Sequence, residues 1–264
     1  MRIVVPIKQV PDTANVKMDP ETGTMIREGL DAIINPLDLY GIELAITLKE
    51  QYGGSVTVIS MGPLSAEKAI RGAIAMGADD GVLVSDKKFG GSDTWATSYT
   101  LAKAIEKLEY DLIICGERAT DGDTGQVGPG IAAWLDLPVA GYVARVDELA
   151  GGHIQVERLV EEGYQLVRLR LPCVLTVVKE VSRPRLPTLQ GKKRARRIEL
   201  PVFSLESLDI DNGSVGLKGS PTKVVRIENA KLSRGGTVVQ ADDGAGIERA
   251  IDGMMAFLKD RGII

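Results

Sequence analysis

Residues 115–129 (CGERATDGDTGQVGP) combine glycines and polar side chains between a short apolar run and a stretch with helical spacing. A glycine-rich loop that ends at a helix N-terminus presents backbone N–H donors and the positive end of the helix dipole, which together hold a phosphate. The residues suited to close approach or to donation are Gly122, Gly125, Gly128, Thr124 and Gln126. The pattern therefore predicts a phosphate or nucleotide site.

Two acidic residues in this loop limit where an anion could lie. Asp121 and Asp123 would repel an adjacent phosphate, so we expect them to cap the helix, to accept backbone N–H bonds or to bind ribose hydroxyls. Neither GxxxxGK[ST] nor GxGxxG occurs, so the loop is neither a P-loop nor the usual dinucleotide fingerprint. An ordinary glycine- and aspartate-rich loop is the alternative interpretation.

The chain offers few other reactive groups. Its single histidine, His153, adjoins the predicted turn at Gly151–Gly152 and is expected to be exposed and inert. Cys115 ends an apolar run with no histidine nearby in sequence, which favours a core residue over a nucleophile. Cys115 and Cys173 are too few for a disulfide scaffold or a zinc site. The sequence gives no support for a Ser/His/Asp triad.

A basic run at residues 192–197 (KKRARR) follows a proline-rich stretch that contains Leu186 and Leu189. It could be a solvated loop, a nucleic-acid patch or a docking surface for an acidic protein. No aromatic residue lies among the basic ones for base stacking, and 32 Lys+Arg against 36 Asp+Glu give a net charge of −4. We rank nucleic acid last, because leucine beside basic residues suits a protein anchor with steering charges.

Alternating strands and helices position the glycine-rich loop. Short apolar runs predict buried parallel strands at residues 2–7, 56–60, 81–84 and 112–115. Helical spacing predicts helices at 36–52, from a cap at Ser65, from a cap at Asp93, and at 126–135. This order favours an α/β fold with a doubly wound, mostly parallel sheet, whose ligands bind at the carboxyl ends of the strands.

The spacing of apolar residues changes to period two after residue 138. Gly151–Gly152 predicts a hairpin turn within a small antiparallel extension, and a strand is expected at 173–178. Helical spacing returns only at 247–258, so the tail is expected to lie on another protein. No apolar stretch approaches the roughly 20 residues of a membrane span or forms a signal peptide, which favours a cytoplasmic protein.

Seven segments resemble the beta subunit of electron-transfer flavoprotein. They are IKQVPDT (7–13), INPLDLYGIELAITLKE (34–50), SMGP (60–63), AMGADDGVLVSD (75–86), ATDGDTGQVGP (119–129), VERLVEEGYQLVRLRLPCVLTV (156–177) and PRLPTLQGKKRAR (184–196). The resemblance implies a Rossmann-like fold of the adenine nucleotide alpha hydrolase type and a heterodimer with an alpha subunit.

The resemblance also implies the residues that hold the family's adenine nucleotide. They map onto Pro6, Asn35, Pro36, Leu37, Asp38, Met61, Arg118, Ala119, Thr120, Asp121, Gly122, Asp123, Thr124, Gly125, Gln126, Val127, Gly128 and Pro129. KQVPDT with DGDTGQVGP resembles the electron-bifurcating branch of anaerobes, which binds FAD here, whereas the other branch binds AMP. In the bifurcating branch, NADH supplies electrons to ferredoxin or flavodoxin and, through the alpha subunit, to a flavin dehydrogenase.

The implied organisation has three parts. Residues 1–185 form the nucleotide- or flavin-binding domain, 186–200 a partner recognition loop with Leu189, Lys192 and Lys193, and 201–264 a C-terminal arm on the alpha subunit. A nucleotide-binding regulatory module of the universal-stress type is a further alternative. Such a module would end near residue 150, so the recognition loop and the arm argue against it.

Overall fold

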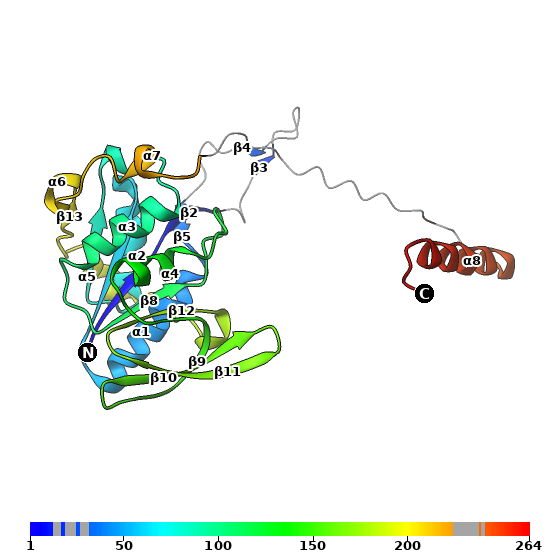
Figure 1. Ribbon diagram of the computed structural model, residues 1–264, viewed down its shortest axis with the longest axis horizontal. Coiled ribbons are helices and arrows are strands. Elements are labelled where there is room, and N and C mark those ends of the chain that lie inside the picture. Colours follow the sequence, from blue (N-terminus) through cyan, green and yellow to red (C-terminus); the bar gives the residue numbers. More distant parts are fainter. Residues whose placement is uncertain (13–16, 19–24, 27–31, 224–237, 239–240) are drawn as a thin grey trace. The chain divides into compact units, whose positions relative to one another are not determined.

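The computed structural model describes residues 1–12, 17–18, 25–26, 32–223, 238 and 241–264. The chain divides into two units, Met1–Lys223 and Val224–Ile264 (Figure 1), and each is described by itself. Thr13, the last residue of the IKQVPDT segment, lies outside the described residues, as does most of the stretch 224–240.

The first unit is built on a nine-stranded sheet. In spatial order its strands are β11 (Gly163–Arg170), β10 (His153–Val160), β9 (Val139–Ala150), β12 (Cys173–Val177), β8 (Leu112–Gly116), β1 (Arg2–Pro6), β6 (Ser55–Met61), β7 (Asp80–Val84) and β13 (Val202–Phe203). The pairs from β9 to β13 are parallel, and β10 and β11 add antiparallel strands at one edge. The predicted doubly wound sheet with an antiparallel extension is confirmed.

The direction of winding reverses between β1 and β8. The chain proceeds from β1 through β6 to β7 on one side, and from β8 to β12 on the other. In open α/β sheets, ligands bind at the carboxyl ends of the strands at such a reversal. The loops that follow β1 and β8 therefore flank the most favourable place for a ligand.

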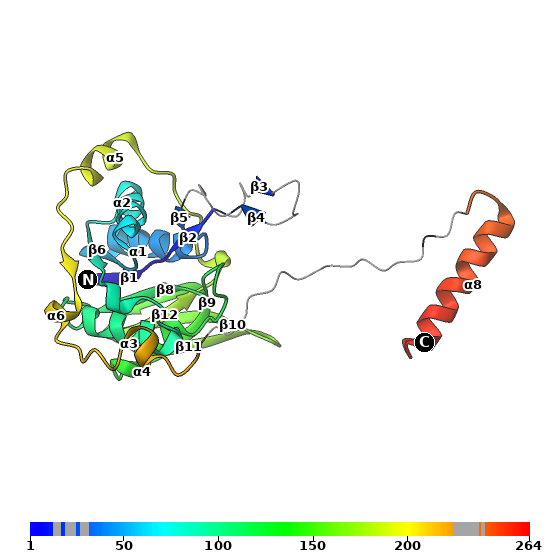
Figure 2. The ribbon, with the colours of Figure 1, turned by 90° about the horizontal axis from the view of Figure 1, so that it is seen from above.

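Helices cover both faces of the sheet (Figure 2). They are α1 (Asp38–Tyr52), α2 (Glu67–Met76), α3 (Thr94–Ile105), α4 (Val127–Trp134), α5 (Leu189–Ala195), α6 (Leu205–Leu208) and α7 (Gly216–Gly219), with 3-10 turns at Leu64–Ala66, Lys87–Phe89 and Lys179–Val181. The side chain of Asp93 caps α3 as predicted. Ser65 does not cap α2, because it lies inside a 3-10 turn and donates to Gln9 Oε1 instead.

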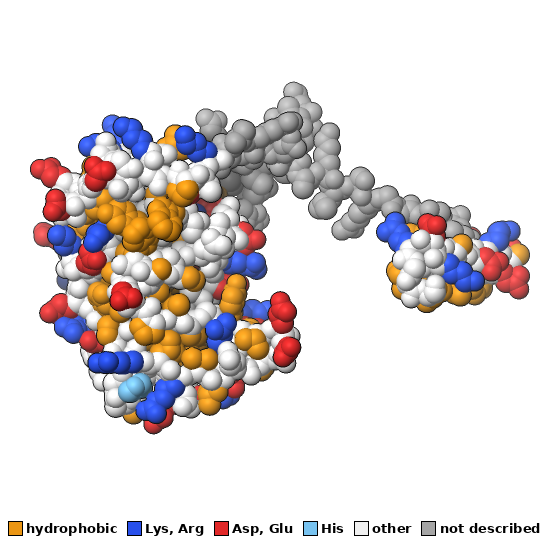
Figure 3. All heavy atoms as spheres, viewed as in Figure 1, with side chains coloured by type: hydrophobic (Ala, Val, Ile, Leu, Met, Phe, Trp, Pro, Cys, Tyr) orange, Lys and Arg blue, Asp and Glu red, His pale blue; other side chains and the backbone are white. Residues whose placement is uncertain are grey.

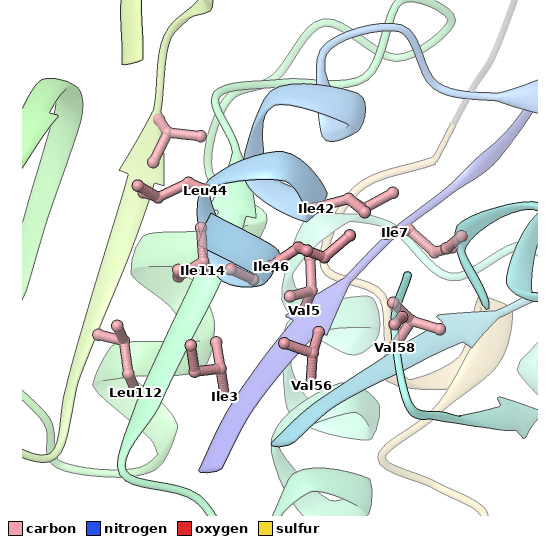
Figure 4. Packing of buried hydrophobic residues seen from close by; sticks show 14 of the residues in the cluster. Ile3, Val5, Ile7, Ile42, Leu44, Ile46, Val56, Val58, Leu112 and Ile114 are labelled. Atoms are coloured by element: carbon pink, nitrogen blue, oxygen red, sulfur yellow. The ribbon is translucent and has the colours of Figure 1, made fainter. Parts of the chain in front are cut away.

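Successive residues of β1 face opposite cores. Ile3, Val5 and Ile7 point to α1, where Figure 4 shows them packed against Ile42 and Ile46. Val4 faces the other side, in the core formed with α3 and α4. A pair of helices thus covers each face of the sheet: α1 and α2 pack on one face, and α3 and α4 pack on the other.

The structure differs from the sequence prediction in residues 186–223. Residues 189–195 form α5, capped by the side chain of Thr188, rather than a flexible loop. Residues 201–223 belong to the first unit, because β13 pairs with β7 and Leu205 and Leu208 are buried beside α3. The sequence assigned this stretch to the arm because its buried residues are too widely spaced to show a period.

Two small antiparallel sheets join β2 (Gln9–Pro11) to β5 (Ala32–Ile34), and β3 (Lys17–Met18) to β4 (Met25–Ile26). The second unit contains α8 (Gly244–Asp260), which confirms the helix predicted at 247–258. Within the described ranges, no helix has the length and hydropathy that crossing a bilayer requires.

Candidate functional site

Asn35 joins its own loop to two others at the reversal point of the sheet, through its backbone N–H and its buried side chain. Its backbone N–H donates to Lys8 O at 2.8 Å, in the loop after β1. Its Nδ2 donates to Arg118 O at 2.8 Å, and its Oδ1 accepts from Thr120 N at 3.2 Å, both in the loop after β8. Asn35 is fully buried, so these bonds have no competition from water. The residue fixes the spacing of the loops that flank the predicted ligand.

Asp38, the first residue of α1, is the second buried polar group of this cluster. Its Oδ1 accepts from Asn35 Nδ2 at 2.9 Å and its Oδ2 from the Lys8 backbone N–H at 2.7 Å. Burial raises the pKa of Asp38 to about 7, although both hydrogen bonds oppose that shift. The buried carboxyl group thus connects the start of α1 with the loop after β1 and with Asn35.

The acidic side chains of the glycine-rich loop form ion pairs. Lys8 Nζ lies 2.6 Å from Asp121 Oδ1, and Arg118 lies 3.1 Å from Asp123 and 3.3 Å from Glu117. The two aspartates thus do not cap α4, whose first turn has no side-chain cap. The sequence could not show this pairing, because Lys8 is more than a hundred residues away from Asp121 in the chain. Lys8 and Arg118 thus balance two of the three acidic charges, which reduces the repulsion that an anion would meet here.

Backbone donors at the start of α4 are free to bind a ligand. Within the described part of the chain, the amides of Gly125, Gln126, Val127 and Gly128 have no hydrogen-bond partner. Gly125 has a φ of 64°, which favours glycine. A Cβ on Gly128 would lie 2.5 Å from Thr176 Cγ2, so this glycine lets α4 approach the sheet closely. Free amides at a helix N-terminus are the donors that a phosphate requires.

These features fit the phosphate part of an adenine nucleotide or a flavin dinucleotide. Neutral amides provide the donors, while Lys8 and Arg118 provide positive charge that is shared with their acidic partners. Ser60, buried at the end of β6 beside Met61, has a hydroxyl without a hydrogen-bond partner among the described residues. A bound ligand would give such groups a partner.

The structure brings most of the predicted site residues to this edge of the sheet. Pro6 ends β1, Met61 ends β6, and residues 118–129 follow β8. Thr124 Oγ1 lies 3.3 Å from Thr94 Oγ1, so the loop also touches the start of α3. Lys8 and Thr94 are contacts that the sequence prediction missed. For Lys8 the available signal was its place directly after the first strand.

Two more sequence predictions concern the cysteines. Cys115 and Cys173 are both buried and free, and burial raises the pKa of each thiol, that of Cys173 to about 12. Neither is an activated nucleophile. The expectation that Cys115 is a core residue is confirmed.

The predicted partner-binding residues form a separate region on α5. Leu189 is 72% exposed, and Lys192 and Lys193 are also exposed. The preceding Arg185 forms ion pairs with Glu43 and Glu50 of α1, and α5 packs on α2. Contacts with α1 and α2 thus fix the position of this segment, while the side chain of Leu189 faces solvent.

Comparison with known proteins gives a consistent result. The family model described as "Electron transfer flavoprotein domain" matches residues 22–207. An electron transfer flavoprotein subunit beta from Thermoanaerobacterium thermosaccharolyticum is 46% identical over 265 residues, 100% of both chains. Protein FixA from Azotobacter vinelandii is 47% identical over 86% of this chain and 83% of its own. The caffeyl-CoA reductase-Etf complex subunit CarD from Acetobacterium woodii is 41% identical over 100% of both.

Proposed function

Because the chain belongs to the electron transfer flavoprotein family, with relatives named as beta subunits over its full length, we propose that it is the beta subunit of a heterodimer that binds FAD and divides electrons from NADH. One electron of each pair goes to ferredoxin or flavodoxin. The other goes through the alpha subunit to a flavin dehydrogenase.

One observation carries the cofactor proposal. Asn35 ties the loops after β1 and β8 together beneath an uncapped helix N-terminus with free amides. The amides of Gly125 to Gly128 would hold the phosphates, and Asn35 and Asp38 would keep the loop in place from behind. When bound, FAD supplies the exchange between two-electron and one-electron transfer. The remaining task of the chain is to hold that group and to shield it from water.

The choice of FAD over AMP rests on the sequence of the loop and on one relative. KQVPDT and DGDTGQVGP resemble the bifurcating branch. The relative from Acetobacterium woodii is named as part of a caffeyl-CoA reductase-Etf complex. A non-bifurcating carrier with structural AMP is the alternative, and the same amides would hold its phosphate.

Leu189 is proposed as the anchor for the dehydrogenase. It is an exposed leucine, while Lys192 and Lys193 lie beside it to attract an acidic surface. Replacement of Leu189 by Ala should slow electron transfer to the dehydrogenase at least about tenfold and leave the flavin content unchanged. Leu166→Ala, at a leucine that is 58% exposed on β11, is the matched control. Equal rates for Leu189→Ala and the control would reject the anchor.

Bifurcation itself is tested by an anaerobic assay with the purified heterodimer, NADH, ferredoxin and the dehydrogenase with its substrate. The proposal predicts that NADH reduces ferredoxin only while the dehydrogenase is accepting electrons. Reduction of the dehydrogenase alone, with ferredoxin left oxidised, would assign the protein to the non-bifurcating alternative.

A further inference from the structure

The only two tryptophans of the chain lie together on the surface of the first unit. Trp95 on α3 and Trp134 on α4 have ring centroids 4.7 Å apart in an edge-to-face arrangement, and Tyr99 lies 4.8 Å from Trp134. Trp95 is 56% exposed and Trp134 37% exposed. Figure 3 shows hydrophobic side chains gathered over α3 and α4. We name Trp95, Tyr99 and Trp134 the aromatic patch.

The segments that carry the aromatic patch have no charged residues, and the nearest charges on α3 are Lys103 in its last turn and Glu106, which form an ion pair. Residues 94–102 of α3 and 127–134 of α4 contain no Asp, Glu, Lys or Arg, whereas the surface of α2 carries Glu67, Lys68 and Arg71. Depletion of charge and enrichment in Trp and Tyr distinguish the centre of a protein interface from ordinary surface. Trp and Tyr are also the residues that most often dominate binding energy. The patch has the composition of an interface.

The C-terminal chain leaves the first unit beside this patch. The backbone N–H and hydroxyl of Thr222 both donate to Asp93 Oδ2, at 2.9 and 2.7 Å, and Asp93 is the residue that caps α3. Trp95 follows two residues later. The first unit ends at Lys223, so the arm begins at the edge of the aromatic patch.

Among the described residues of the second unit, 238 and 241–264, no hydrophobic core buries the apolar side chains. In α8, Ile247 and Ile251 are each 50% exposed and Phe257 is 54% exposed, while Gly246 is the only buried residue of the helix. An amphipathic helix of this kind needs an apolar partner.

We propose that the aromatic patch is part of the interface with the alpha subunit, continuous with the arm that leaves the first unit at Lys223. This rests on the heterodimer proposed above. The occupant is an apolar, uncharged surface of the alpha subunit, which would cover Trp95, Tyr99 and Trp134 together. Because Thr124 touches Thr94 at the start of α3, the same contact would border the glycine-rich loop.

The test uses the full-length chain labelled with 5-fluorotryptophan. The two fluorine resonances are assigned with Trp95→Phe and Trp134→Phe, and their H₂O/D₂O shifts are measured before and after the unlabelled alpha subunit is added. The proposal predicts that both resonances move and lose their solvent shift in the complex. The proposal would be overturned if both resonances kept the chemical shifts and solvent shifts of the free subunit in a complex whose mass shows one alpha and one beta subunit.

Charged substitutions supply an independent measurement. Trp95→Lys and Trp134→Lys should each weaken association with the alpha subunit at least about tenfold, as measured by sedimentation. Tyr164→Lys, at a tyrosine that is 61% exposed on β11, is the matched control and should change it by less than about twofold. Circular dichroism of each variant establishes that it is folded. If wild-type subunits do not associate at all, the heterodimer proposal fails; if they associate and the lysine variants match the control, only the aromatic interface fails.

Discussion

At the scale of single residues, the candidate site depends on two buried polar side chains that hold its loops in place. The resemblance predicts that Asn35 and Asp38 contact the cofactor, and in the structure their side chains bond to each other and to Lys8, Arg118 and Thr120. Such buried and fully bonded polar pairs set the positions of the donors around them. The sequence located them at the site only through the family resemblance of the segment 34–50. It could not assign their role, because the contacts span up to 85 residues.

Asp38 should make the stability of the chain depend on pH. Its folded-state pKa, about 7, lies above the ordinary value of 3.8, so the native state binds more protons than the unfolded state between these values. The free energy of unfolding should therefore fall as the pH rises from about 5 to about 7, by an amount on the order of a few kcal/mol, and then level off. Urea unfolding at several pH values measures this slope.

The Asp38→Asn variant is the control for that measurement, since its side chain does not titrate. Glu50 and Asp111 have a lowered pKa in the folded protein, so protonation breaks their ion pairs only at a pH below the ordinary pKa of a carboxyl group. Their titration therefore does not affect the stability between pH values of about 5 and 7. The slope of the variant should be flatter than that of the wild type. Identical slopes would show that Asp38 does not titrate between pH values of about 5 and 7.

Replacement of Asn35 by Ala should loosen the glycine-rich loop. The substitution leaves Thr120 N without its acceptor and Arg118 O without its donor, so the loop loses its attachment to α1. We expect nucleotide affinity to fall at least about tenfold, measured by equilibrium dialysis of the flavin or of AMP. Asn212→Ala, at an exposed asparagine, is the control. Retention of wild-type affinity in Asn35→Ala would refute the positioning role.

At the scale of elements, the close packing of α4 on the sheet decides where its free amides lie. The sequence predicted α4, its neighbours and a doubly wound, mostly parallel sheet, because buried parallel strands and amphipathic helices have distinct periods. It did not predict α5 or β13. The first is seven residues long with three charged residues in a row, and the second has two residues, so neither is long enough to show a hydrophobic period.

A methyl group at position 128 should displace α4. In Gly128→Ala, the new Cβ would lie 2.5 Å from Thr176 Cγ2, and we expect a loss of about 2 kcal/mol in stability together with weaker nucleotide binding. Adding Thr176→Ser removes Cγ2 but keeps the hydroxyl that accepts from Tyr142 N at 3.0 Å. The double variant should recover most of both losses. Failure to recover, with Thr176→Ser alone behaving as wild type, would exclude this contact as the cause.

At the scale of the whole molecule, the chain has a folded first unit and a second unit whose described residues contribute to neither hydrophobic core. Both hydrophobic clusters lie within Met1–Lys223, one on each face of the sheet. The sequence predicted the arm from its lack of periodicity, but placed its start about twenty residues too early. The sequence did not predict that residues 201–223 pack on the first unit, because their buried residues, such as Leu208 and Val215, are irregularly spaced.

Truncation after Lys223 should therefore leave the first unit intact. Its free energy of unfolding is expected to stay within about 0.5 kcal/mol of the full-length value, because no residue of either core is removed. Urea unfolding followed by circular dichroism provides the comparison. Loss of the cooperative transition in the truncated chain would mean that the arm contributes to the core.

The cofactor content of the purified heterodimer tests the central claim most directly. Acid extraction followed by chromatography gives the molar amounts of FAD and AMP per heterodimer. The proposed assignment predicts two FAD per heterodimer and no AMP, with one FAD lost in Asn35→Ala. One FAD with one AMP per wild-type heterodimer would contradict it and identify a carrier that does not bifurcate.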